Sequence, residues 1–409
     1  MHRVSLGIYR KSIGLRRAAE PRALCHRGRP SARHGSIGCV KAAPESEARR
    51  ESRAIAAAWA CFGIGTAFGL LALAGEPRPI ADEGGIAQPA AGIAAIVTAA
   101  AFVLSTLLHR RRETAPMPGW QTTVSHLSTA AITLAFGAVA YVAVLTGGEI
   151  LALGLQGLEA PAIGGALLTG IAASTGGWLA FQAGVELTTR DLATLLFAYL
   201  TIGTLFAMIT AADPAWWQRH FSDLGTGDGA GSWAFNGTVV IAGLLVGSVG
   251  AFVGRDLHRW LGDAALPRIA WVVGLFALTG AALAGVGLFP LHLAPLPHNI
   301  AAFGALGLFA LTAAVVTVVM PGPPRAMLLT TVGAGVALLV ALLLWRPGDV
   351  YSAAGLEAIA VGVGFVWMTT LVRTLAAFVP DASRPSERAH LLAGRLDSTS
   401  LPARGKVGS

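Results

Sequence analysis

The sequence is short of charged residues and of cysteine, and both shortages narrow the class of protein. Only 13% of the 409 residues are Asp, Glu, Lys or Arg, compared with about 25% in soluble domains. The cysteines are Cys25, Cys39 and Cys61, and no two of them have the C-x-x-C spacing of zinc or redox motifs. The cysteine pattern therefore favours neither a disulfide framework nor a zinc finger nor a redox site.

The charged residues that are present form short clusters, and the runs between them are rich in Gly, Ala, Leu and Val. A helix needs about 20 such residues to cross the hydrocarbon core of a bilayer. Strands would alternate at period two, which the sequence does not sustain, and backbone in lipid must satisfy its own hydrogen bonds. We therefore predict an all-α, polytopic transmembrane helix bundle. Its ten spans are 54–75, 90–108, 127–147, 162–184, 192–211, 234–254, 269–289, 300–320, 326–345 and 354–378.

Arginine content alternates between successive connections. Arginines follow every even-numbered span, whereas the connections after odd-numbered spans are mainly acidic. Because Lys and Arg mark cytoplasmic loops, we predict that both termini are cytoplasmic in a multi-pass protein of a bacterial plasma membrane. Most of the net charge of +8 lies in residues 1–53, which we interpret as a disordered tail that contacts lipid head groups, or as a start-site artefact. Nucleic acid is not an expected partner.

Polar residues gather in the connections that this topology places outside. Such residues are costly inside a bilayer, so their clusters point to function. They occur between the fifth and sixth spans, between the seventh and eighth, and at the start of the tenth. All of them can converge on one outward-facing cavity. The residues are His220, Ser222, Asp223, Asp228, Asn236, His292, His298, Asn299 and Glu357.

These side chains suggest three roles. Carboxyl and imidazole groups can act as general acids and bases, and the catalytic candidates are Asp223, His298 and Glu357. The candidates for ligand binding are Ser222, Asp228, Asn236 and Asn299. Imidazole also binds zinc, and the candidate metal ligands are His220, His292 and His298. The histidines lack an i, i+4 pair on one helix, so zinc is one hypothesis among others and the cofactor is left open.

Several of these candidates also have a purely structural explanation, and His292 or Glu357 can simply be solvated in a loop or in the head-group zone. Ser222 or Asp223 can cap a short helix or turn before the following glycine. Asn236 can bond a neighbouring helix, as polar residues in spans commonly do. His298 and Asn299 can form the N-terminal cap of the eighth span. These alternatives explain why the same residues occur at the same positions and give them no catalytic or binding role.

Several short motifs in the second half of the chain carry a family resemblance. They are Ser222-Asp-Leu-Gly, Phe235-Asn236, Gly285-Val-Gly-Leu-Phe-Pro290, His298, Gly355-Leu-Glu357 and Trp367. Together they resemble the DUF998 family of prokaryotic integral membrane proteins, over roughly residues 192–378. The resemblance implies a six-helix domain with an extracytoplasmic loop, and it brings no established activity. Ala302 and Ala358 depart from the family pattern, because many members have His and Arg there.

The resemblance also suggests how the chain is divided. We expect a tail (1–53), a four-helix transmembrane region (54–184), a six-helix domain (192–379) and a second disordered tail (380–409). More distantly, the sequence is similar to a group of DRAM-related membrane proteins that are linked to lipid handling. We therefore predict a membrane lipid as partner and a site that binds or processes it. A zinc-dependent hydrolase similar to alkaline ceramidases, a transporter or permease, and a non-catalytic assembly factor are the alternatives.

Overall fold

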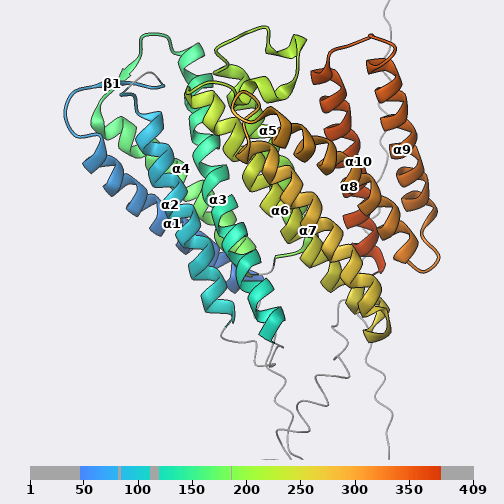
Figure 1. Ribbon diagram of the computed structural model, residues 1–409. Helices are drawn as coiled ribbons and strands as arrows, with labels where there is room; N and C mark the ends of the chain where they lie inside the picture. The colour runs from blue at the N-terminus through green and yellow to red at the C-terminus, as the bar shows by residue number, and fades with distance from the viewer. Residues whose placement is uncertain (1–46, 82–83, 111–118, 186, 379–409) are drawn as a thin grey trace, which may run out of the picture. The chain divides into compact units, whose positions relative to one another are not determined.

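The computed structural model describes residues 47–81, 84–110, 119–185 and 187–378 (Figure 1). Within these residues, ten helices are long and apolar enough to cross a membrane, which confirms the predicted all-α transmembrane bundle. The predicted tail 380–409 and residues 1–46 of the predicted N-terminal tail lie outside the described residues. The first helix begins at Glu47, ahead of the predicted start at Ala54, because no helix-breaking residue separates this stretch from the span.

The helices follow the order of the predicted spans. They are α1 (Glu47–Ala72), α2 (Ala87–Arg110), α3 (Gly119–Gly154), α4 (Ala162–Val185), α5 (Thr189–Ile209), α6 (Ala230–Leu261), α7 (Leu266–Leu288), α8 (Pro295–Val319), α9 (Arg325–Trp345) and α10 (Ala353–Phe378). Short elements lie between them: β1 (Arg78–Pro79), β2 (Glu159–Ala160), and the 3-10 helices η1 (Trp216–Gln218), η2 (Phe221–Gly225) and η3 (Asp263–Ala265).

Local sequence signals set the beginnings of two helices that matter for the site. Before α5, the Thr188 hydroxyl accepts a bond from the Asp191 amide, and the Asp191 carboxylate accepts one from the Thr188 amide at 3.1 Å. This is a capping box. The eighth helix begins at Pro295, before the predicted start at Ile300, since proline is favoured in the first helical turn. The earlier start places His298 inside the first turn of α8.

The helices α6 and α7 cross with their backbones in contact. A Cβ atom at Gly243 would lie 2.4 Å from the carbonyl oxygen of Gly280, and a Cβ at Gly280 would lie 2.4 Å from the carbonyl oxygen of Gly243. Neither position has room for a larger residue unless the backbone shifts. Small residues at such crossings allow transmembrane helices to approach closely, so α6 and α7 form a tightly joined pair.

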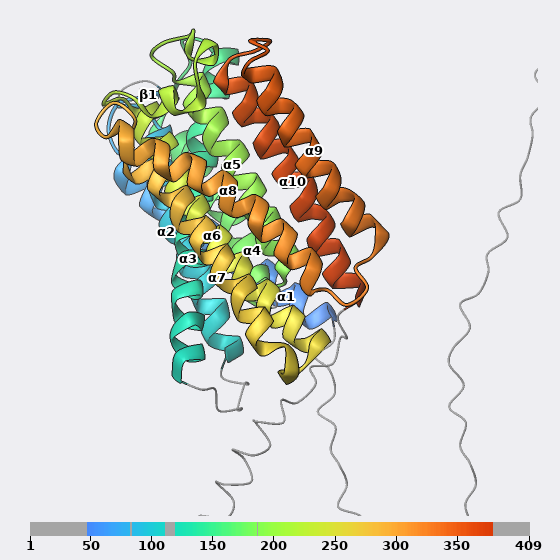
Figure 2. The ribbon, with the colours of Figure 1, turned by 45° about the vertical axis from the view of Figure 1, so that its right-hand side comes forward.

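The remaining helices pack around this pair and around α4. In the first part of the chain, α1 and α2 both pack on α4, while α3 lies against α2, α5 and α6. The strands β1 and β2 pair antiparallel, so the α1–α2 connection meets the α3–α4 connection. At the other end of the sequence, α9 packs mainly on α10, and Figure 2 shows the two side by side. The α10 helix also contacts α5, η1 and η2.

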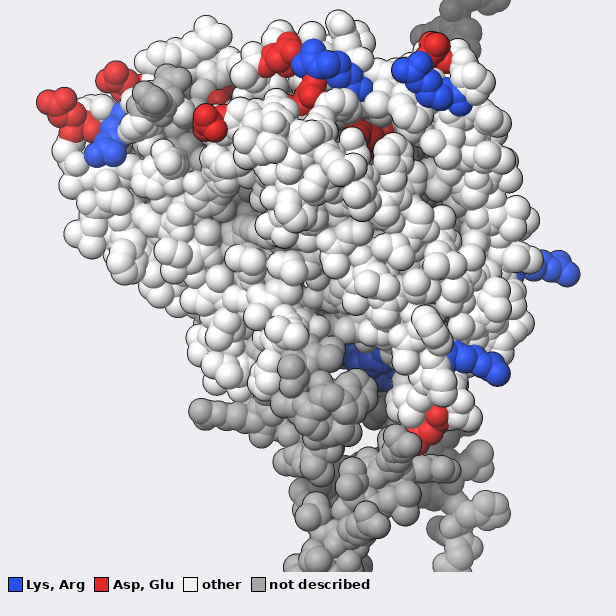
Figure 3. Space-filling view, viewed as in Figure 1, with Lys and Arg blue, Asp and Glu red and all other residues white. Residues whose placement is uncertain are grey.

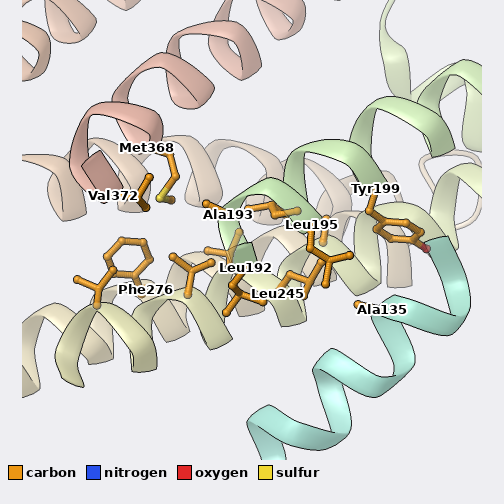
Figure 4. Packing of buried hydrophobic residues seen from close by; sticks show 14 of the residues in the cluster. Ala135, Leu192, Ala193, Leu195, Tyr199, Leu245, Phe276, Met368 and Val372 are labelled. Carbon is orange, nitrogen blue, oxygen red and sulfur yellow. The ribbon is translucent and has the colours of Figure 1, made fainter. Parts of the chain in front are cut away.

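The core is apolar and draws on helices that are distant in sequence. Figure 4 shows side chains of α5, α6, α7 and α10 meeting, among them Leu192, Leu245, Phe276 and Met368. The largest fully buried side chain is Trp367 of α10. These contacts bring the beginning and the end of the second half of the chain together, which is what allows loops far apart in sequence to share one site.

Hydroxyl groups join α8, α9 and α10 inside the bundle. The indole N–H of Trp367 donates to the Thr331 hydroxyl at 3.0 Å, and the hydroxyls of Thr331 and Thr317 lie 2.8 Å apart. Because hydrocarbon offers no other partner to these groups, the bonds fix how the three helices pack.

Charged side chains gather at the two ends of the helices, and the surface between them is almost free of charge on the face shown in Figure 3. One of these ends, at the top of Figure 1, carries the α1–α2, α3–α4, α5–α6, α7–α8 and α9–α10 connections. We call this end the connection end. Most acidic groups visible in Figure 3 are at this end. The compartment that it faces stays a prediction.

Candidate functional site

The candidate site is centred on η2, the short helix that carries the Ser222-Asp-Leu-Gly motif. This segment lies at the connection end, between α5 and α6, and α10 and α6 pack against it. The apolar side chains of Phe221 and Leu224 turn inward and contact buried residues of α5, α6 and α7, including Phe235 and Val286. Burial of these groups holds η2 against the bundle, so its polar groups meet three other elements.

The central contact joins Ser222 of η2 to His298 of α8. The hydroxyl oxygen of Ser222 lies 2.9 Å from Nε2 of His298. Both residues are buried, with only 8% of Ser222 and 3% of His298 exposed. They are therefore shielded from the surrounding medium, and each must find its hydrogen-bond partners within the protein.

The other ring nitrogen of His298 faces the end of α7. Its Nδ1 lies 2.9 Å from the carbonyl oxygen of Phe289 and 3.1 Å from that of Val286. Carbonyl oxygens can only accept, so Nδ1 carries a proton. In the neutral ring Nε2 is then the acceptor, and Ser222 donates its hydroxyl proton to it.

The α7 carbonyls are available because of Pro290. In a continuing helix the carbonyl of Val286 would accept from the N–H of residue 290, and proline has no N–H. The last carbonyls of a helix need partners from elsewhere. His298 is that partner, so the Gly-Val-Gly-Leu-Phe-Pro motif and the histidine that follows it form one unit.

Glu357 of α10 contacts the backbone of η2. Its Oε2 accepts the N–H of Phe221 at 2.6 Å. Among the described residues, no hydrogen bond links Glu357 to Ser222, Asp223 or His298. The predicted catalytic acid thus lies at the site but reaches it through a peptide group.

Asn236 of α6 holds the other end of η2. Its amide Nδ2 donates to the carbonyl oxygen of Gly225 at 2.9 Å. A Cβ atom at Gly225 would lie 2.4 Å from Oδ1 of Asn236, so glycine is needed where the segment passes this side chain. The structural alternative for Asn236 was a hydrogen bond to a neighbouring helix, and the structure shows that bond to the backbone of the 3-10 helix η2.

Asp223 points toward an ion-pair cluster rather than toward His298. The guanidinium of Arg219 donates to the carboxylate of Asp223 and, at 2.7 Å, to that of Asp213. This hydrogen bond from Arg219 holds the pKa of Asp213 below its usual range, and the two carboxylates together raise the pKa of Arg219. Because Asp213 and Arg219 are exposed, we assign this cluster a local role in shaping the loop.

The predicted histidine ligands do not form a cluster. His220 places Nδ1 3.3 Å from Oδ1 of Asp223, but without hydrogen-bond geometry. His298 uses both ring nitrogens as described above, and His292 is exposed. Within the described residues, no group of three or more His, Cys, Asp or Glu side chains could hold a metal ion. The remaining candidates, Asp228 and Asn299, are exposed.

The capping alternatives for the motif residues are wrong. The residue before η2 is His220, and Ser222 bonds His298 instead of a backbone amide. The residue before α8 is Ala294, so neither His298 nor Asn299 is its cap. The sequence motifs point to Ser222 and His298 separately and do not indicate the carbonyl oxygens at the end of α7. The one available signal for those carbonyls was Pro290, which leaves acceptors unused.

Comparison with known proteins finds a family that is similar to the segment carrying this site. The family model described as "Protein of unknown function (DUF998)" matches residues 192–374. No curated protein and no solved structure matches the chain. The matched segment runs from α5 into α10 and contains η2, His298 and Glu357. The segment that carries every group of the site, residues 192–374, thus matches the DUF998 family model, as the sequence motifs predicted.

Proposed function

We propose that this integral membrane protein transfers the acyl group of an outer-leaflet lipid through Ser222, with His298 as general base. The observation that carries the proposal is the chain of two hydrogen bonds from Ser222 to His298 and from His298 to the end of α7. A nucleophile, a base within hydrogen-bond reach, and a group that orients the base are the parts of an activated serine.

The reaction follows from these contacts. The Ser222 oxygen attacks the acyl carbonyl carbon, and its proton passes to Nε2 of His298. The tetrahedral intermediate then collapses: the C=O bond re-forms, the bond to the lipid's alcohol or amine breaks, and Nε2 returns the proton to that leaving group. Water then attacks the acyl-serine, gives a proton to Nε2 and releases the carboxylic acid, and Ser222 regains its proton. His298 ends as it began.

The end of α7 supports this role of His298. The imidazole becomes a cation during each transfer, and Nδ1 then faces two carbonyl oxygens at the C-terminus of a helix. That end carries the negative pole of the helix dipole, which stabilises a histidine cation by about 0.3–2 kcal/mol. In this site the backbone supplies what a carboxylate supplies in a serine–histidine–aspartate arrangement.

A lipid substrate is supported by the surface around His298. Leu293 is 73% exposed, Leu296 69% and Ile300 65%, and all three lie within one or two turns of the histidine. A run of exposed apolar side chains at the end of a transmembrane helix suits the boundary between head groups and acyl chains. An acyl ester or amide lies at the same depth in a lipid.

A serine-directed fluorophosphonate probe tests the proposal on the full chain in detergent. The wild type should be labelled at Ser222, and both Ser222→Ala and His298→Gln should lose the label. The matched control is Ser248→Ala, since Ser248 is a buried serine that bonds only a carbonyl of its own helix. Labelling that is absent from the wild type, or unchanged in Ser222→Ala, would overturn the proposal.

The burial of Ser222 and His298 favours a second candidate, a purely structural pair in a non-catalytic membrane protein. The same variants separate the two. In that case the probe leaves the wild type unlabelled, while His298→Gln lowers the melting temperature because one amide cannot bond the α7 carbonyls and Ser222 at the same time.

A further inference from the structure

We propose that Glu357 is a positioning residue, which holds Ser222 in place for His298 by binding the backbone of η2. This inference rests on the proposed function, because it concerns the same serine. The sequence suggests that Glu357 is a catalytic acid or base. In this inference its role is that of a fixed hydrogen-bond acceptor.

The geometry places the effect of Glu357 next to the nucleophile. Its carboxylate accepts the N–H of Phe221 at 2.6 Å, and Ser222 is the next residue, with its Cα about 3.8 Å away from that of Phe221. The ring of Phe221 packs on that of Trp216 with centroids 5.0 Å apart. A shift of this amide would move Ser222 by a similar amount, while His298 stays bound to α7.

Two further bonds connect the start of α10 to the same loop. The Ser352 hydroxyl donates to the carbonyl oxygen of Trp217 at 2.7 Å, and the Ala354 amide donates to that of Arg219 at 2.9 Å. With Glu357, these bonds attach the first turn of α10, and the residue just before it, to residues 217–221. These contacts run from α10 to backbone atoms, so they fix the path of the chain rather than any one side chain.

The segment is tied at its other end by Asn236, which binds the carbonyl of Gly225. Ser222 therefore lies between two tethers, one from α10 and one from α6, and its hydroxyl is directed at α8. Catalytic groups must be held close to the productive geometry, because a displacement of about 1 Å can reduce the rate about a hundredfold. Glu357 and Asn236 supply that restraint for η2.

Substitution at Glu357 separates positioning from proton transfer. Gln keeps an oxygen that can accept the Phe221 N–H but cannot exchange protons at neutral pH, whereas Ala removes the acceptor. If Glu357 positions Ser222, Glu357→Gln should be labelled by the fluorophosphonate within about twofold of the wild-type rate and Glu357→Ala about tenfold more slowly. Glu76→Ala, at an exposed acid of the same end, is the control and should match the wild type.

Hydrogen–deuterium exchange supplies a second measurement, which does not depend on the reactivity of Ser222. Loss of the acceptor should speed exchange of the amides in 219–225 in Glu357→Ala and leave it unchanged in Glu357→Gln. Equal losses of labelling in both variants would show that the carboxyl moves protons, and unchanged exchange in Glu357→Ala would show that it holds nothing. An unlabelled wild type would overturn the proposed function instead, while the exchange result would still decide whether Glu357 restrains η2.

Discussion

The carbonyl oxygen of Val286 accepts a hydrogen bond from His298, whose Nδ1 lies 3.1 Å away. This contact links the last turn of α7 to the first turn of α8 and fixes which nitrogen of the ring faces Ser222. It also explains why a proline-ended helix and a histidine in the next helix occur in one motif. The end of one helix thus determines the chemistry available to the next.

Replacement of Pro290 tests that link. Pro290→Ala gives residue 290 an N–H that can compete with His298 for the Val286 carbonyl. We expect fluorophosphonate labelling of Ser222 to slow about tenfold, since a base held in the wrong orientation loses most of its contribution. Pro321→Ala, in the α8–α9 connection, is the control and should label normally. Normal labelling of both variants would show that His298 does not need the Val286 carbonyl.

The crossing of α6 and α7 makes a prediction about stability. Gly243→Ala should lower the melting temperature, because its Cβ would meet the Gly280 carbonyl at 2.4 Å and overpacking costs about 1–3 kcal/mol. Gly247 lies one turn further along the same helix, and a Cβ there finds its nearest neighbour at 4.0 Å. Gly247→Ala should therefore be neutral or stabilising. Equal effects at both glycines would contradict the close crossing.

The hydroxyl contacts of α9 make a separate prediction. Thr331→Val keeps the shape of the side chain but leaves the indole N–H of Trp367 without its acceptor, which should cost about 1–2 kcal/mol. Thr175→Val is the matched control, since Thr175 is exposed and bonds only its own helix. Thermal unfolding of the purified variants in detergent measures both. A Thr331→Val protein as stable as the control would show that the hydrogen bond from Trp367 to Thr331 does not stabilise the packing of α9.

The orientation of the bundle is testable by cysteine labelling. In a chain whose three cysteines are replaced, single cysteines are introduced at Asp228, Asp349 and Arg268, all exposed positions. A membrane-impermeant maleimide should label Asp228→Cys and Asp349→Cys on intact cells, and Arg268→Cys only after permeabilisation, because arginine-rich connections stay inside. Labelling of Arg268→Cys alone on intact cells would reverse the topology and put the site in the cytoplasm.

The ten helices could be predicted because hydrocarbon imposes a length and a composition on any segment that crosses it. The boundaries were less accurate. The third span was predicted as 127–147, whereas α3 runs from Gly119 to Gly154. The helix is longer because Gly and Thr near its ends do not stop a helix that is supported by neighbours. Similarly, α8 begins at Pro295 within what the sequence suggested was a loop.

The site was predicted only in part. The motifs singled out Ser222, Asn236, His298 and Glu357, and the structure places all four on or against η2. Their pairing could not be predicted, because the contact between Ser222 and His298 spans 76 residues and depends on how α6, α7 and α8 cross. Backbone partners are harder still to predict. Every residue has a carbonyl group, so the sequence does not show that the carbonyl of Val286 or the amide of Phe221 takes part in the site.

The contact between Gly243 and Gly280 has a consequence for the response to bilayer thickness. Because the backbones of α6 and α7 touch there, Asn236 and Val286 lie on one closely packed pair of helices, and His298 is hydrogen-bonded to that pair. Glu357 lies on α10, which contacts this helix pair through side chains. Helices adapt to thinner or thicker membranes by tilting, so a change in lipid length would alter the inclination of α10 and shift Phe221 relative to a stationary imidazole.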